Sequence, residues 1–195
     1  MINMITQIDF YILNAIQGIR CGFLDFIMPC ITYLGSGGII WIITSVILLF
    51  FRRTKKAGAA VIIALILGWI LSTMLLKGIV ARERPFNVEG ALLNETSLLI
   101  GAPSGRFSFP SGHALSSFSA AAVLLFYDRR MGLPALALAV LIAFSRLYLY
   151  VHFPSDILGG AVLGVVFAFI AIFIVNMIWR KIDERKLPDN TEQNN

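Results

Sequence analysis

Charged residues are scarce in this chain. Only 14% of its 195 residues are Asp, Glu, Lys or Arg, whereas 58% are hydrophobic. A soluble domain of this size needs more polar surface, so the composition excludes one and indicates an integral membrane protein. The apolar runs between the charges each approach the ~20 residues that cross a bilayer as an α-helix. They lack the period-two alternation of a membrane β-barrel, which is therefore excluded as well.

Cysteines and clustered acidic residues are also few. The two cysteines, Cys21 and Cys30, are too few and wrongly spaced for a metal cage or a redox pair, and we interpret them as packing residues. Three glutamates near the candidate site residues, Glu83, Glu89 and Glu95, form no carboxylate cluster of the kind that binds magnesium. We therefore expect no metal and no other cofactor.

The apolar runs predict an all-α fold, an integral membrane helical bundle of five to six transmembrane helices. It forms a single membrane-embedded domain over residues 1–186, followed by a disordered, almost wholly polar tail at residues 187–195. Residues 1–23 are interpreted as an N-terminal helix in the membrane interface, with a short sixth span as the alternative. No Lys or Arg precedes Arg20, so this segment does not resemble a removable signal peptide.

Five spans are predicted from the continuous apolar runs. The first, residues 24–51, contains Pro29 and the glycine-rich residues 35–38 and is expected to be kinked. The others are residues 57–76, 112–127, 133–150 and 157–179. Gly160 and Gly164 in the last span form a small-xxx-small pair, which we interpret as close helix packing within the chain rather than a dimer face.

Basic clusters predict the orientation of these spans. Residues 52–56 form a dense basic run, which the positive-inside rule keeps on the cytoplasmic side. Counting spans from there puts two more basic pairs on that side, Arg129 with Arg130 and Arg180 with Lys181. Three polar segments then reach the external face: residues 77–85, 110–113 and 145–156. We expect these segments to share one site. Orientation explains the net charge of +5, so no nucleic-acid partner is predicted.

The external segments carry the groups that phosphoryl transfer needs. Its transition state spreads negative charge over the phosphate oxygens, so catalysis is largely positioning and cationic stabilisation. Lys77, Arg84 and Arg146 supply three cations, and arginines bind phosphate oxygens bidentately. The backbone N–H groups of Ser111 and Gly112, at the start of a predicted helix, are expected to add an anion nest, with the Ser111 hydroxyl as a further donor.

Both histidines of the chain, His113 and His152, fall in these segments. Asp156 follows His152 by four residues, so its carboxylate is placed to accept the N–H of one imidazole nitrogen and leave the other free to attack phosphorus. His113 then protonates the leaving oxygen and later activates the water that hydrolyses the phosphohistidine. The alternative nucleophiles, Ser111 and Ser145, have no comparably placed base.

These segments resemble the three signature motifs of the type-2 phosphatidic acid phosphatase superfamily. That superfamily includes bacterial lipid pyrophosphate phosphatases, glucose-6-phosphatase and the vanadium haloperoxidases. Residues 77–85 match Lys, six residues, Arg-Pro; residues 110–113 are Pro-Ser-Gly-His; and residues 145–156 match Ser-Arg, five residues, His, three residues, Asp. No motif position departs from the pattern.

The resemblance implies a metal-independent hydrolase that acts through a phosphohistidine. It implies these roles: Lys77, Arg84, Ser111, Gly112 and Arg146 bind phosphate, His113 is the acid and base, His152 is the nucleophile, and Asp156 orients it. The chain looks like the bacterial lipid phosphatases, so the expected partners are the bilayer and a lipid phosphate or diphosphate. The expected location is the external, periplasmic face of a bacterial cytoplasmic membrane.

Several substrates and roles stay open at this point. Undecaprenyl diphosphate ranks first, with phosphatidylglycerophosphate and phosphatidic acid as alternatives. A lipid phosphotransferase and a non-catalytic lipid-binding or transport protein are the other classes. The oligomeric state is left open.

Two further features lie in the segment between the second and third spans. Arg82 and Glu83 occupy free positions of the first motif and are interpreted as surface residues or an ion pair. The same segment has more apolar side chains than a solvated loop needs: Leu92, Leu93, Leu98, Leu99 and Ile100. We expect these side chains to rest on the bilayer and to help admit a lipid sideways.

Overall fold

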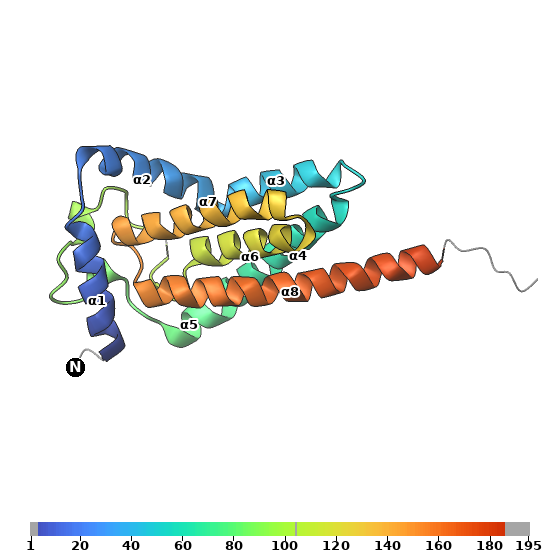
Figure 1. The fold of residues 1–195 in the computed structure, drawn as a ribbon. Helices are drawn as coiled ribbons and strands as arrows, with labels where there is room; N and C mark the ends of the chain where they lie inside the picture. Colours follow the sequence, from blue (N-terminus) through green and yellow to red (C-terminus); the bar gives the residue numbers. More distant parts are fainter. Residues whose placement is uncertain (1–3, 104, 186–195) are drawn as a thin grey trace, which may run out of the picture.

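The computed structural model describes residues 4–103 and 105–185, which form a bundle of helices (Figure 1). Its α-helices are α1 (Met4–Gln17), α2 (Gly22–Gly35), α3 (Ile39–Leu49), α4 (Lys55–Trp69), α5 (Lys77–Val80), α6 (Gly112–Tyr127), α7 (Arg129–Tyr148) and α8 (Pro154–Glu184). A π-helical segment (Ile70–Leu76) joins α4 to α5, and short 3-10 turns occur at Ser36–Gly38, Pro85–Asn87 and Glu95–Ser97. Within the described ranges the chain forms no strand, so the all-α prediction is confirmed.

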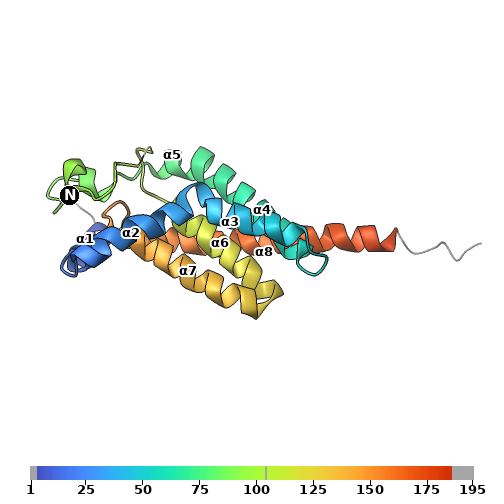
Figure 2. The same cartoon turned by 90° about the horizontal axis from the view of Figure 1, so that it is seen from above.

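Five apolar helical segments account for the predicted spans. Four are long and apolar enough to cross a membrane: Gly22–Leu49, Lys55–Val80, Arg129–Tyr148 and Pro154–Glu184. The fifth, α6, has 16 residues and a length of about 24 Å at 1.5 Å per residue, less than the ~30 Å of bilayer hydrocarbon. Figures 1 and 2 show α6 among α4, α7 and α8, so protein surrounds much of it. The expected bundle of five to six spans agrees with this arrangement.

The first span is broken at its glycines and not at its proline. Pro29 lies inside α2, whereas the helix ends at Gly35 and a new one begins at Ile39. Gly37 and Gly38 have φ angles of 60° and 71°, a left-handed conformation that glycine adopts without the steric cost of a Cβ atom. The glycines therefore permit the change of direction between α2 and α3.

Helix ends differ from the predicted bounds in several places. The differences are that the second span continues to Val80, α7 begins at Arg129, and α8 covers Pro154–Glu184. Lys77 is consequently part of a helix rather than the residue after one. Asp128 starts α7 early, because its carboxylate accepts the Arg130 N–H at 2.8 Å and caps the helix. The tail predicted to be disordered, residues 187–195, lies outside the described residues.

Glycines bring α8 very close to α6. A Cβ atom added to Gly160 would lie 2.6 Å from the Ser111 carbonyl oxygen, and one added to Gly164 would lie 2.5 Å from the Leu115 carbonyl oxygen. Both glycines therefore serve packing within the chain, as interpreted from the sequence. Alanines dominate the surrounding core between α4, α6, α7 and α8.

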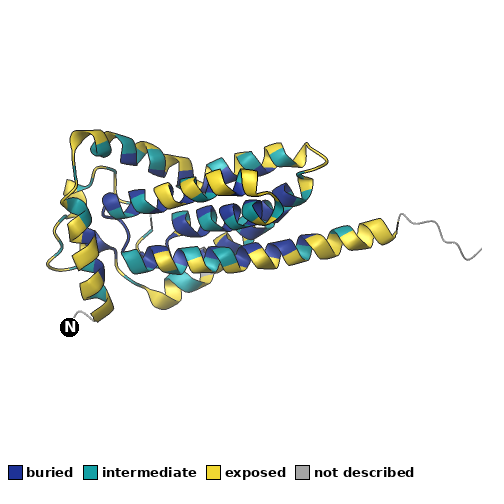
Figure 3. Cartoon of the chain, viewed as in Figure 1, coloured by how far each residue is buried: buried dark blue, intermediate teal, exposed yellow. Residues whose placement is uncertain are grey.

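Large apolar side chains remain exposed on the outward faces of the helices (Figure 3). Examples from the first and last spans are Phe23, Phe26, Tyr33, Phe169 and Phe173. Soluble monomers rarely expose contiguous apolar surface of this extent. On a membrane-spanning bundle, this surface faces lipid.

The two ends of the bundle carry different groups. At one end in Figure 1 lie the α3–α4 connection, the α6–α7 connection and the C-terminal part of α8, which hold the three basic clusters. At the other end lie α1, which runs across the ends of the other helices, residues 81–103 and 105–111, and the α7–α8 turn. The three motif segments therefore meet at one end, as the charge pattern predicts. The interfacial placement of residues 1–23 stays a prediction.

The segment between α5 and α6 is not spread over the bilayer as expected. Three of its apolar side chains pack against a buried cluster around Tyr148 and Tyr150: Leu93, Leu98 and Ile100. Leu92 and Leu99 remain exposed. The expectation is wrong for the three packed residues, because the protein itself offers them an apolar surface.

Candidate active site

The predicted site residues come from several elements at the same end of the bundle. Lys77 begins α5, Arg84 lies between α5 and α6, Ser111 precedes α6, Gly112 and His113 open α6, Arg146 is near the end of α7, His152 is in the α7–α8 turn, and Asp156 is in the first turn of α8. Interactions among these residues, described below, show that the fold gathers them into one site.

Arg84 and Lys77 border the same point of the segment between α5 and α6. Arg84 is buried, and it donates from Nε to the Gly105 carbonyl at 2.7 Å and from Nη1 to the Val151 carbonyl at 2.9 Å. A Cβ atom added to Gly105 would lie 3.7 Å from Arg84 Nη2 and 3.9 Å from Lys77 Nζ. Burial lowers the pKa of Arg84 to about 10 although the Asp156 carboxylate opposes the shift. Arg84 therefore keeps its positive charge at neutral pH.

Arg146 is buried on α7 and is held from α2. Its Nη1 donates to Thr32 Oγ1 at 2.6 Å. Its Nε is buried with no hydrogen-bonding partner in the described part of the chain. A buried guanidinium nitrogen without a partner costs free energy that an anion can recover. The arrangement suits the binding of phosphate oxygens.

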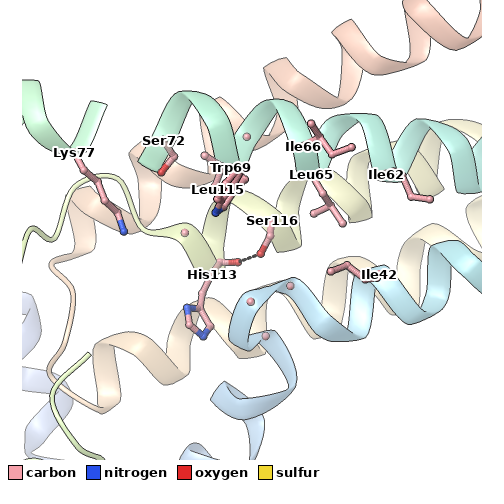
Figure 4. Close-up of a pocket in the computed structure, with 15 residues that line it drawn as sticks. Ile42, Ile62, Leu65, Ile66, Trp69, Ser72, Lys77, His113, Leu115 and Ser116 are labelled. Carbon is pink, nitrogen blue, oxygen red and sulfur yellow. Dashed lines mark hydrogen bonds between the residues drawn. The ribbon is translucent and has the colours of Figure 1, made fainter. Parts of the chain in front are cut away.

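A cavity of about 530 Å³ extends from the site into the bundle (Figure 4). Lys77 and His113 lie at one end of it, and Ile42 and Ile62 lie at the other, with Leu65, Ile66 and Trp69 along its wall. His152 and Arg146 are buried outside this lining. His113 is thus the one of the two histidines that faces the cavity.

The His113 ring packs against the end of α2. A Cβ atom added to Gly35 would lie 2.9 Å from His113 Cδ2, so glycine leaves the room that the ring occupies. His113 Nε2 is buried without a hydrogen-bonding partner among the residues described. The ring also interacts with the Thr32 backbone of α2, and proton exchange with a substrate oxygen is the role that the sequence predicts for it.

His152 and Asp156 lie next to each other, as their spacing predicts. His152 Nδ1 is 3.5 Å from Asp156 Oδ2, and that oxygen also accepts the Phe153 N–H at 2.8 Å. The distance is that of an electrostatic contact longer than a hydrogen bond, which is common before substrate binds. Burial lowers the pKa of His152 to about 4; the Asp156 carboxylate opposes the shift, and Arg146 and Arg84 add to it. The imidazole is therefore neutral at pH 7, the form that a nucleophile needs.

The anion nest at the start of α6 differs from the prediction. The Ser111 N–H, expected to face phosphate, donates to the Asp156 carbonyl at 3.1 Å in this structure. The Ser111 Oγ accepts the Ala114 N–H at 3.5 Å and caps the helix. Gly112 remains exposed, with its N–H in the first turn, where helices leave donors unpaired. Ser145 donates to the Ile142 carbonyl at 2.7 Å, which removes it further as a nucleophile.

Two charged residues outside the predicted set also belong to this site. Arg82 forms ion pairs with Asp9 at 2.7 Å and with Asp156 at 2.8 Å, so it is ion-paired, as one of the two interpretations had it, but its partners are these carboxylates and not Glu83. Asp9 is the only acidic residue before Asp25 and is buried on α1. A lone carboxylate in an amphipathic apolar helix is a signal that points to a buried partner. Arg82 offers no such signal, because its partners are distant in sequence.

Comparison with known proteins places these features in context. The family model described as the PAP2 superfamily matches residues 54–180, more than half of the chain. A lipid A 4'-phosphatase of Bacteroides thetaiotaomicron is 29% identical over 191 residues, which cover 93% of this chain and 83% of that protein. An undecaprenyl-diphosphatase of Sulfolobus acidocaldarius is 36% identical over 136 residues, which cover 69% of this chain and 63% of that protein.

Two solved structures are also similar to this chain. The crystal structure of Aquifex aeolicus LpxE is similar with a TM-score of 0.69 and 29% identity, covering 83% of this chain and 93% of that chain. A transmembrane PAP2-type phosphatidylglycerolphosphate phosphatase from Bacillus subtilis has a TM-score of 0.68 and 27% identity, covering 96% of this chain and 90% of that chain.

Proposed function

The chain belongs to the PAP2 superfamily and is a multi-pass membrane hydrolase of lipid phosphates; on that premise we propose that it hydrolyses an isoprenyl diphosphate, with undecaprenyl diphosphate ranked first, through a phosphohistidine on His152. The observation that carries the proposal is the division between the two histidines. His113 faces the apolar cavity, and His152 is buried beside the arginines. A lipid in the cavity would therefore present its leaving oxygen to His113 and its phosphorus to His152.

The first step transfers the terminal phosphoryl group to the protein. The Nε2 lone pair of His152 attacks the terminal phosphorus, while Asp156 holds the proton on Nδ1. The bond from phosphorus to the bridging oxygen breaks, and His113 gives that oxygen a proton. Lys77, Arg84 and Arg146 neutralise the charge on the phosphoryl oxygens, and the Gly112 N–H adds a neutral donor. The lipid monophosphate leaves through the cavity.

The second step returns the enzyme to its starting state. His113, now neutral, takes a proton from a water molecule, and the resulting hydroxide attacks the phosphohistidine from the side that the lipid has left. Inorganic phosphate departs, and the His152 imidazole is neutral again. The low pKa of His152 supports this cycle, because the free imidazole does not retain a proton at neutral pH.

The cavity supports an isoprenoid chain in preference to a glycolipid. Away from Lys77 and His113, the polar side chains of its lining are Ser72 and Ser116, and the rest is apolar or glycine. Sugar hydroxyl groups need hydrogen-bonding partners when they are buried. An isoprenoid chain needs none, so it matches the wall of the cavity better.

A lipid phosphate monoester is the second candidate substrate. The relatives named as a lipid A 4'-phosphatase and a phosphatidylglycerolphosphate phosphatase both align with most of the chain, which favours this class. Phosphatidic acid belongs to the same class. A phosphotransferase would share every residue of the site and differ only in the acceptor of the phosphoryl group.

We place the site on the external face of a bacterial cytoplasmic membrane. The support is the distribution of charge, because the basic clusters lie at the end of the bundle opposite the site. A protease or a membrane-impermeant thiol reagent tests the orientation. A cysteine introduced at Glu89, which is exposed in the segment between α5 and α6, should react in intact spheroplasts.

The deciding experiment is phosphate release by the detergent-purified protein in EDTA. Undecaprenyl diphosphate, phosphatidylglycerophosphate and lipid A are offered side by side, with His152→Ala as the control. We expect undecaprenyl diphosphate to react fastest, activity to survive EDTA, and the variant to be inactive. Protein that is mixed with substrate labelled in the terminal phosphate and then quenched in alkali should carry the label on His152.

Each other outcome changes one part of the proposal. Activity lost in EDTA, or retained by His152→Ala, would make the catalytic assignment wrong. If a lipid phosphate monoester reacts faster than undecaprenyl diphosphate, the second candidate substrate would replace the first. A labelled phospholipid formed when an acceptor lipid is added would make the protein a transferase.

A further inference from the structure

Asp9, Arg82 and Asp156 come from three separate parts of the chain and form one buried ionic cluster. Asp9 is on α1, Arg82 follows α5, and Asp156 is in the first turn of α8. Asp9 is 3% exposed and Asp156 is 0% exposed, while the Arg82 side chain is 19% exposed. Carboxylates are seldom buried to this extent without a charged partner. Here the two carboxylates share Arg82.

The contacts hold both terminal nitrogens of the Arg82 guanidinium and one of its faces. Its Nη2 lies 2.7 Å from Asp9 Oδ2, and its Nη1 lies 2.8 Å from Asp156 Oδ1 and 2.6 Å from Ser155 Oγ. The same guanidinium lies over the Phe153 ring, 4.1 Å from the ring centroid. Asp9 in turn accepts the Ser155 N–H at 2.9 Å and the Ser155 hydroxyl at 2.5 Å. Lysine cannot reproduce this planar, forked geometry.

The two oxygens of Asp156 have different partners. Oδ1 accepts from Arg82, whereas Oδ2 accepts the Phe153 N–H and lies 3.5 Å from His152 Nδ1. The bond to Oδ1 sets the rotation of the carboxylate and thereby the position of Oδ2 relative to the imidazole. Without Arg82, Oδ1 would be a buried oxygen with no partner, and the carboxylate would turn to find one.

We propose that Asp9 and Arg82 are positioning residues for the reaction at His152. Asp9 orients Arg82, Arg82 orients Asp156, and Asp156 orients the imidazole. The helix α1, which contributes no residue to the three sequence motifs, is thus part of the catalytic machinery. This inference rests on the phosphohistidine mechanism proposed above.

Arg82 should behave differently from the two arginines assigned to phosphate, Arg84 and Arg146. Its guanidinium is already occupied by two carboxylates, so an Arg82 variant loses the orientation of the nucleophile and no contact with the substrate. We expect Arg82→Lys to lower kcat about 10- to 100-fold and to leave KM within about 2-fold. Asp9→Asn keeps the shape of the side chain and removes its charge, so it should lower kcat by a smaller factor. The double variant should lose less than the product of the two single losses.

Arg20→Gln is the matched control. Arg20 pairs with Asp25 at 3.2 Å in the connection between α1 and α2, and this pair touches no atom of Asp156. The substitution therefore removes an arginine–aspartate ion pair beside α1 without changing the cluster. We expect its kcat to stay within about 2-fold of the parent value, because a partly exposed ion pair away from the site contributes little. All variants are compared at equal amounts of folded protein.

The outcomes separate this inference from the proposed function. An active parent and an inactive His152→Ala, together with an unchanged kcat in Arg82→Lys and Asp9→Asn, would overturn the inference alone. An equal loss of kcat in Arg20→Gln would overturn it too, because anchoring of α1 would then set the rate. Activity that persists in His152→Ala would instead overturn the proposed phosphohistidine mechanism, on which this inference rests. Should Arg82→Lys fail to fold, Asp9→Asn carries the same kcat test.

Discussion

The helical core of this molecule and the cap over one end of it meet at the candidate active site, yet each region is held together by different interactions. In the core, made of α3, α4, α6, α7 and α8, helices approach through alanine and glycine, as at Gly164 against Leu115. In the cap, made of α1, residues 81–103 and 105–111, and the α7–α8 turn, side chains tie loops together by polar bonds. Tyr150, for example, donates to Asn14 and accepts the Leu92 N–H.

The division extends to the catalytic groups. His113 and Arg146 stand on core helices, Lys77 begins α5 after the π-helical segment that follows α4, and His152 and Arg84 stand on segments of the cap. Phosphate bound at the site would therefore contact residues of both regions. Substitutions within the core should mainly lower the free energy of unfolding. Substitutions at the junction, where the core and the cap meet around the site residues, should mainly lower the rate of phosphate release. Four predictions test this difference.

The largest effect is expected at Arg146, where α7 of the core meets α2. Arg146→Ala removes a buried cation with an unpaired nitrogen, so kcat/KM should fall about 100- to 1,000-fold. Phosphate release at equal amounts of folded protein measures this. Thr32→Val, which removes only the partner of Arg146, should cost much less. A loss below about 10-fold in Arg146→Ala would mean that this arginine does not bind the reacting phosphoryl group.

A smaller loss is expected at Gly35. The methyl group of Gly35→Ala would lie 2.9 Å from His113 Cδ2 and 2.7 Å from Ile142 Cγ2, so the ring must move. Displacement of the acid–base group should lower kcat about 10- to 100-fold. Gly22→Ala in the same helix meets nothing within 4 Å and serves as the control. Equal rates for Gly35→Ala and the parent protein would show that His113 tolerates the shift.

Gly164→Ala should give the opposite pattern, a loss of stability with little loss of rate. The added methyl group would lie 2.5 Å from the Leu115 carbonyl oxygen and force α6 and α8 apart. Overpacking of this kind costs about 1–3 kcal/mol. Thermal unfolding in detergent measures the shift, and phosphate release per folded molecule measures the rate. A large fall in rate without a change in unfolding temperature would contradict the division between core and junction.

The smallest expected effect concerns the pH titration of His152, whose ring resonances should not change in the pH range where an ordinary histidine titrates. In His113→Asn the one remaining imidazole is His152, with a folded pKa near 4 against 6.5 for an unperturbed histidine. Its ring resonances should therefore stay constant as the pH falls below 6.5 and change only near pH 4. The unfolded chain binds a proton in that interval and the folded chain does not, so stability should decrease as the pH is lowered from 6.5 toward 4. A midpoint near 6.5 in the folded protein would show that the imidazole is not buried.

The core was largely predictable from the sequence. Apolar runs of bilayer length and three basic clusters predict the spans and bring the three motif segments to one end, because both signals are local in sequence. The Gly160 and Gly164 pair indicates where helices approach closely. Helix ends were less predictable, because a cap such as Asp128 depends on one side chain and not on an average over many.

The cap was much less predictable, because its interactions join residues distant in sequence. Arg82 reaches Asp9 across 73 positions and Asp156 across 74, and no local pattern records either pairing. Thr32 is 114 positions from Arg146. The hydrogen bond from the Ser111 N–H to the Asp156 carbonyl also depends on how α8 packs against α6, which is tertiary structure and not a local sequence pattern. The residues of the motifs were thus visible in the sequence, and the distant residues that contact them were not.

The π-helical segment Ile70–Leu76 sets the angular phase of Lys77. An α-helix turns about 100° per residue, and a π-helical turn closes its hydrogen bonds one residue later than an α-turn does. The segment therefore shifts everything after it around the helix axis, and Lys77 arrives on the side that faces Gly105 and Arg84. Removing one residue from the segment would restore α-helical phase and rotate the ammonium group about 100° around the helix axis, away from these neighbours. A departure from α-helical periodicity within this apolar helix thus places the cation that we assign to phosphate binding.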